Sequence, residues 1–182
     1  MRLHIWLLSS VLAFAIPGLA LADDQMTPLA ADGDWIALSH APSVEDPPDI
    51  CLAASLPQYG FGLRIDDQGN IDIRYSNDSW SLPANVTGNL KISVNGHKYS
   101  YAIQGNTSTT VDAPLTQDQL TSLVTDMEIA SSMQVTAGSG APASIPLDGS
   151  KASLTALLTC AGIQNPTNNT GGANPFGTPA NQ

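Results

Sequence analysis

The sequence predicts a single α+β domain, in which an antiparallel sheet of about seven strands carries two short helices and is closed by one disulfide. Three observations lead to this prediction. Apolar and polar residues alternate through two hairpins, and two later segments repeat apolar residues at helical spacing. The third is that a chain of 182 residues holds only two cysteines, Cys51 and Cys160. We place the domain at residues 35–163.

Residues 1–22 have the pattern of a signal peptide. A basic start with Arg2 precedes an apolar run over residues 5–16, Pro17 breaks the run, and Ala20-Leu21-Ala22 matches an A-x-A cleavage site. The run is shorter than a helix that spans a bilayer, and no second apolar segment follows it. We expect cleavage after Ala22, a periplasmic or secreted product, and no membrane insertion afterwards.

The chain is acidic. Sixteen Asp and Glu residues stand against six Lys and Arg residues, which gives a formal net charge of −10. Such a charge repels nucleic acid and anionic membrane, because both are bound through clustered Lys and Arg. It is compatible with a basic protein partner, and it also serves solubility alone.

The two cysteines are predicted to form one structural disulfide. Cysteines in an exported chain pair in this way, and a loop of this size stabilises the fold by ~4–5 kcal/mol at most. The alternative is a metal site or a reactive thiol. No histidine and no further cysteine lies at ligand spacing from Cys51 or Cys160, so we predict neither a metal nor a cofactor.

The N-terminal part of the domain is predicted from short apolar segments. Residues 23–34 are expected to be a flexible lead-in, Trp35 to Leu38 the first strand, and residues 50–54, around Cys51, the second. The prolines of the intervening segment, residues 41–48, prevent strand pairing there.

The first hairpin spans residues 61–76. Its alternation requires Ile65 opposite Ile71, which a three-residue loop with Gly69 in the left-handed conformation supplies. Asp66 and Asp67 in the turn suggest calcium. An EF-hand loop, however, needs glycine at its sixth position and a carboxylate at its twelfth, and this turn has neither. A solvated turn is the preferred interpretation.

The second hairpin turns at Asn95-Gly96, the dipeptide with the strongest two-residue hairpin preference. Val94 should lie opposite His97, with aliphatic residues facing aromatic ones along the strands. The other face carries Lys91 and Lys98. Lys91, Lys98 and His97 form the candidate surface patch for an anion, and solvated lysines without a ligand are the alternative.

Four further strands are expected at residues 80–83, 109–111, 133–136 and 143–147. The loop between the last two, residues 137–142, resembles a phosphate loop in its glycines. It lacks the lysine of a P-loop and does not match G-x-S-x-G, so a plain hairpin loop is predicted.

Two helices are predicted in the second half of the domain. The first follows Pro114 and begins with a capping box formed by Thr116 and Gln119. The second runs to Cys160, with Ser150 as its expected cap and Gly162 as its end. Residues 164–182 are rich in Asn, Gly, Pro and Thr and are expected to form a disordered tail.

No catalytic residue is predicted, and we expect a protein that is not an enzyme. Beyond the signal segment the only histidines are His40 and His97, and no serine or carboxylate is paired with either in the sequence. An envelope hydrolase is the alternative, in which His97, His40 and the Asp66-Asp67 turn would meet in one cleft. A structural envelope component that associates through an exposed strand edge is another.

The order of these features resembles small exported proteins of alphaproteobacteria. The features are Trp35, the Cys51 segment, W-S-L-P at Trp80, the V-N-G hairpin, and a closing S-I-P-L-D-G-S-K-A-S-L-T-A-L-L-T-C that fits "sLxGs…aL…l…C". The resemblance covers about residues 35–163 and implies export and one domain, without adding a site. A compact scaffold closed by a disulfide, the lack of a catalytic constellation in the sequence and an acidic surface lead us to expect a non-enzymatic binding or inhibitory module of the bacterial periplasm.

Overall fold

The computed structural model describes residues 25–164, so the predicted signal peptide and the tail after residue 164 lie outside the described residues. The strands are β1 (Gln25–Asp32), β2 (Trp35–Ala41), β3 (Ile50–Ser55), β4 (Phe61–Asp66), β5 (Ile71–Ser76), β6 (Thr87–Val94), β7 (His97–Gly105), β8 (Thr110–Leu115), β9 (Ser132–Ala137) and β10 (Ala143–Pro146). The helices are η1 (Pro57–Tyr59), α1 (Gln117–Met127) and α2 (Ser150–Cys160).

All strands belong to one antiparallel sheet in the order β1-β2-β3-β4-β5-β8-β7-β6-β9-β10. The predicted α+β class is confirmed, with one antiparallel sheet and two α-helices. The sheet, however, has ten strands and not about seven. One addition is β1, which replaces part of the expected flexible lead-in. It lacks a clear alternation because it is an edge strand with Pro28 and an irregularity between Pro28 and Ala30.

Both predicted hairpins have the expected register. Ile65 lies opposite Ile71, and Val94 lies opposite His97. Asn95 and Gly96 both have positive φ angles, 49° and 80°, as a two-residue type I′ turn requires. The turn residues therefore determine which side chains of β6 and β7 point inward.

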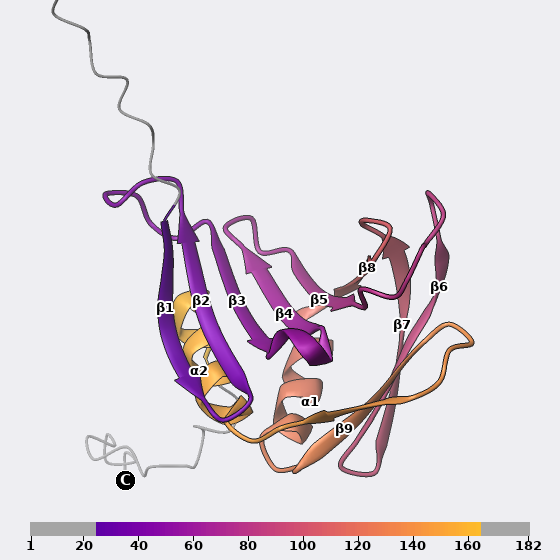
Figure 1. The fold of residues 1–182 in the computed structure, drawn as a ribbon. Helices are drawn as coiled ribbons and strands as arrows, with labels where there is room; N and C mark the ends of the chain where they lie inside the picture. Colours follow the sequence, from indigo (N-terminus) through magenta and orange to yellow (C-terminus); the bar gives the residue numbers. More distant parts are fainter. Residues whose placement is uncertain (1–24, 165–182) are drawn as a thin grey trace, which may run out of the picture.

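The sheet curls until its two ends approach each other (Figure 1). The indole nitrogen of Trp35, on β2, donates to the carbonyl oxygen of Pro146, on β10, at 2.8 Å. The backbone nitrogen of Asp34 donates to the carbonyl of Asp148 at 3.0 Å. These bonds join the second strand of the sheet order to its last strand, so the sheet is almost a closed barrel.

Both helices pack on the inner face of the curled sheet. Helix α2 lies across β1, β2 and β3, and α1 lies beneath the β6–β7 hairpin, whose side chains it contacts. Each helix buries an apolar stripe, comprising Leu120, Leu123, Val124 and Met127 in α1 and Leu154, Leu157 and Leu158 in α2. The inward residues of every strand from β2 to β10 join these stripes in one core.

Two of the three predicted helix ends are confirmed. The capping box of Thr116 and Gln119 is present, and Ile163 N donates to Leu158 O at 2.8 Å around Gly162, as in a Schellman motif. The predicted cap at Ser150 is wrong. Gly149 is the cap residue, at φ 81°, because a Cβ there would lie 1.8 Å from the carbonyl oxygen of Asp32.

The predicted disulfide is confirmed. Cys51 on β3 is bonded to Cys160 at the end of α2, with 6.0 Å between the Cα atoms and 109 residues between the two positions. The bond fixes the last helix to the inner face of the sheet.

We expect the Cys51→Ala/Cys160→Ala variant to lose up to ~4–5 kcal/mol of unfolding free energy, because the unfolded chain regains the freedom of a long loop. Urea unfolding of the oxidised protein and the variant measures the difference. Reduced wild-type protein is the control and should unfold with the variant. Equal urea midpoints for the oxidised protein and the variant would rule out this role.

Candidate functional site

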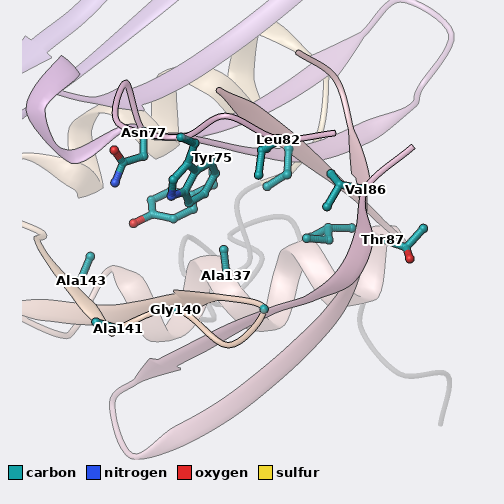
Figure 2. Close-up of a pocket in the computed structure, with 13 residues that line it drawn as sticks. Tyr75, Asn77, Leu82, Val86, Thr87, Ala137, Gly140, Ala141 and Ala143 are labelled. Carbon is teal, nitrogen blue, oxygen red and sulfur yellow. The ribbon is translucent and has the colours of Figure 1, made fainter. Parts of the chain in front are cut away.

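A cavity of about 340 Å³ opens between two loops at one end of the curled sheet. One loop is the β5–β6 connection, residues 77–86, and the other is the β9–β10 connection, residues 138–142. Inward side chains of β5, β7 and β8 line its interior. Figure 2 shows the two loops on opposite sides of this space.

One wall of the cavity is aromatic and aliphatic. Tyr75 and Trp80 meet edge to face, with ring centroids 5.5 Å apart. The aliphatic side chains that continue the wall are Leu82, Val86, Ile103 and Val111. Tyr75 is the last inward position of β5, so the aromatic pair stands where the strand passes into the loop.

The β5–β6 connection is held in place by the β7–β8 connection. Asn77 N donates to Thr109 O at 2.9 Å, and Leu82 N donates to Ser108 O at 2.8 Å. The strand predicted at residues 80–83 is therefore wrong. These residues form a loop, because Leu82 bonds to the β7–β8 loop and Pro83, which has no N–H, cannot extend the pairing.

The opposite wall consists of small residues. Ala137, Gly138, Gly140, Ala141 and Ala143 line the cavity, and their short side chains leave the space open. Gly138 has a φ of 57°, and its N–H donates to Asn89 O at 2.8 Å. The loop that the sequence predicted as a plain hairpin connection thus forms part of the cavity.

The cavity has a mainly apolar lining with few polar groups. Its polar side chains are Tyr75, Asn77, Trp80 and Thr87, and within residues 25–164 no Asp, Glu, His, Lys, Arg or Cys lines it. Burial raises the pKa of the Tyr75 phenol, so this group is neutral at physiological pH. An apolar lining with a few polar groups is typical of small-molecule sites.

The sequence interpretation missed these residues. A signal was available in Trp80, Leu82 and Val86, which are large and apolar in a segment rich in Asn, Pro and Ser. Apolar side chains in a loop must pack on something. The small residues on the opposite wall could not be recognised from the sequence, because they face the cavity only after the sheet has curled.

His97 belongs to a separate cluster around Asp126. Asp126, on α1, is only 5% exposed. Its carboxylate accepts hydrogen bonds from Asn95 Nδ2 at 3.2 Å, from His97 Nδ1 at 2.6 Å and from the Tyr99 hydroxyl. All three donors come from the β6–β7 hairpin, so the cluster fastens the hairpin tip to the helix.

The cluster holds Asp126 as a carboxylate. Burial raises the pKa of this carboxyl group, but hydrogen bonds from Tyr99, His97 and Asn95 outweigh burial and leave the pKa below its usual value. Burial and the bond to Asp126 raise the pKa of Tyr99. At neutral pH a protonated phenol therefore donates to an ionised carboxylate, which is a charge-assisted hydrogen bond.

His40 lies in a different place. Its Nδ1 lies 2.5 Å from Asp49 Oδ1, and the backbone nitrogen of Asp67 donates to Asp49 O at 2.9 Å. The structure thus brings His40 near the Asp66-Asp67 turn through Asp49. It holds His97 at the far end of α1 from this turn, so the three parts that the hydrolase hypothesis required do not share one cleft in the described residues.

Hydrogen bonds within the Asp66-Asp67 turn stabilise its conformation. Asp66 Oδ1 accepts from the backbone nitrogens of Gln68 and Asn70, and the side chain of Asn70 donates to Asp66 Oδ2 at 2.9 Å. This side-chain bond is the main cause of the lowered pKa of Asp66. Within residues 25–164 no group of three or more His, Cys, Asp or Glu side chains is placed to hold a metal ion.

Lys91 and Lys98 lie on the outer face of the sheet, whereas His97 points inward to α1. The candidate patch is therefore divided between two faces, with both lysines on one side.

The function of this chain has to be inferred from the geometry of its structure. No family model, no curated protein and no solved structure matches this chain. In the described part of the chain, no helix is long and apolar enough to cross a membrane.

We expect Asp126→Asn to lower the unfolding free energy at pH 7 by about 2 kcal/mol, since charge-assisted bonds at a buried site are lost. Because the folded-state pKa of Asp126 is depressed, its contribution is present above the unfolded-state pKa of about 3.9. It is lost as pH falls through the folded-state pKa. Urea unfolding between pH 7 and pH 3 should therefore show that the unfolding free energy of the variant decreases less with falling pH than that of the wild type. Asp78→Asn, at an exposed loop position, should retain the wild-type profile. Identical profiles for all three proteins would contradict the assignment.

Proposed function

We propose that this chain is a non-enzymatic binding protein of the bacterial periplasm, and that its ligand is a small, mainly apolar molecule held in the cavity between residues 77–86 and 138–142. The observation that carries the proposal is the lining of that cavity. It combines an aromatic pair and aliphatic side chains with no carboxylate, histidine, amine or thiol. Such a lining gains free energy by burying apolar ligand surface and offers no acid–base pair to a substrate.

The size of the cavity limits the ligand. An apolar cavity of ~150 Å³ accepts benzene, and the cavity here is about 340 Å³. A molecule of two or three aromatic rings, or a branched hydrocarbon of similar volume, fits this space.

Asn77 and Thr87 are both exposed and lie at opposite ends of the cavity, so a polar group at the end of the ligand nearer to Tyr75 would lie beside Asn77. The Oδ1 atom of Asn77 already accepts from the backbone nitrogen and hydroxyl of Ser79, at 2.9 and 2.7 Å. The amide nitrogen of Asn77 is therefore the atom suited to donate to a ligand oxygen.

Export to the periplasm is supported by the sequence of residues 1–22 and by the disulfide, which persists in an oxidising compartment. A ligand present in that compartment would enter the cavity directly from solvent.

We expect Ala137→Leu to weaken binding of a neutral naphthyl fluorophore, N-phenyl-1-naphthylamine, by about tenfold, because added side-chain volume competes with the ligand. Fluorescence titration of the purified protein measures the affinity. Ala102→Leu is the matched control. It makes the same change on the same sheet at an exposed position of β7 outside the cavity, and it should bind like the wild type. Equal affinity of the Ala137 and Ala102 variants, or no binding by the wild type, would overturn the proposal.

A second candidate function is the binding of a basic protein, as an inhibitor would do. The observation that favours it is a groove of about 600 Å³ beside the disulfide, whose lining includes Asp49 before β3 and Asp66 and Asp67 at the β4–β5 turn. The two segments are joined by the Asp67 N to Asp49 O bond at 2.9 Å. These carboxylates, in a chain of net charge −10, would attract a cationic surface.

We expect the protein from Asp23 to Gln182 to retain one basic protein from periplasmic extract at low salt and to release it at high salt, because exposed charges are screened. Asp67→Asn should reduce the retention. Asp118→Asn, which removes the same charge from the first turn of α1, should not. An empty affinity resin, or retention that resists salt, would remove this candidate.

A further inference from the structure

A second surface site lies on the outer face of β6, β7 and β9. It is a shallow groove of about 570 Å³, whose polar side chains are Lys91, Ser93, Lys98, Ser100, Gln134 and Thr136. The register explains how they meet. Lys91 lies opposite Ser100 and Thr136, and Ser93 lies opposite Lys98 and Gln134. Residues opposite each other share a face, so the six form a compact polar array.

The two lysines are unusual among the cations of the sheet. Arg64 is paired with Asp72 at 3.3 Å, and Arg74 forms a two-point pair with Asp112 at 2.9 Å. Within residues 25–164, neither Lys91 nor Lys98 has a salt bridge, and no carboxylate lines the groove. An acidic chain thus leaves two positive charges as diagonal neighbours on one exposed face, where an anion could contact both.

Ile92, Tyr99 and Pro142 also line the groove, and its other polar side chains indicate which groups of a ligand would accompany the anion. Ser93, Ser100, Thr136 and Gln134 offer hydroxyl and amide groups that both donate and accept. They suit a molecule that carries several hydroxyl groups beside its charge. Because the groove is shallow, the molecule lies flat on the strands.

Nucleic acid fits this groove poorly. Tyr99 is the one aromatic residue among those that line the groove in the described part of the chain, and its hydroxyl is bonded to Asp126 on α1, so its ring is not free to stack on a base. The net charge of −10 also repels long polyanions. A short ligand with few charges avoids this repulsion.

We propose that the groove binds a short acidic saccharide, whose carboxylate lies between Lys91 and Lys98 and whose hydroxyl groups bond to the serine, threonine and glutamine side chains. The site is on the opposite face of the sheet from the cavity, and its ligand is of a different class. The proposal does not depend on the cavity holding a ligand.

The test is an NMR titration of the full mature protein with digalacturonic acid as the probe. Amide signals of β6, β7 and β9 should shift, with a dissociation constant of roughly 1 mM. The Lys91→Gln/Lys98→Gln variant should bind about tenfold more weakly. Lys151→Gln, which removes a positive charge from the exposed start of α2, should bind like the wild type.

Two further probes separate the contributions. Maltose, a neutral disaccharide, should bind much more weakly than digalacturonic acid, and inorganic phosphate should bind more weakly because it makes no hydroxyl contacts. Equal binding of maltose would overturn the role of the lysines. Phosphate binding as tight as that of the disaccharide would overturn the saccharide assignment, and shifts confined to other strands would overturn the site.

Discussion

A single sheet has one face to bury, and the whole structure depends on how this face is covered. The inward residues of β2 to β10 are mostly apolar, but the chain supplies only two short α-helices in its described part to cover them. Two helices cannot cover a flat sheet of ten strands. The sheet curls instead, so that its strands cover each other's side chains and the bond from Trp35 to Pro146 closes the curve.

The cavity is a result of the same geometry. Helix α2 fills the part of the curl beneath β1 to β3, and α1 fills the part beneath the β6–β7 hairpin, where Asp126 fastens it. Within residues 25–164 no α-helix fills the end near Tyr75, where two loops flank the cavity. Ala137 and Ala143 stand there with side chains too short to reach the aromatic wall. The proposed ligand would occupy the place that a third element would take in a fully filled barrel.

Local features were predictable from the sequence, and long-range features were not. The turn at Asn95-Gly96, the capping box at Thr116 and the pairing of two cysteines each depend on neighbouring residues or on simple counting, and all three are confirmed. Strand β1 pairs with its neighbour β2, but Pro28 and the irregularity beside it remove the alternation by which a strand is recognised. The glycine at position 149 depends on a partner far along the chain, because the carbonyl of Asp32 leaves no space for a Cβ there. The cavity was missed for the same reason, since its two walls meet only after the sheet has curled.

The closing bond also affects the order in which the fold can form. Trp35 and Pro146 are 111 residues apart in the sequence, and contacts of such long range form slowly because the intervening chain must first be ordered. Strands β1 to β3 find their covering helix only when the last segment of the domain, α2, is present. A chain that emerges N-terminus first would therefore keep its first strands open until synthesis or transport of the domain is almost complete.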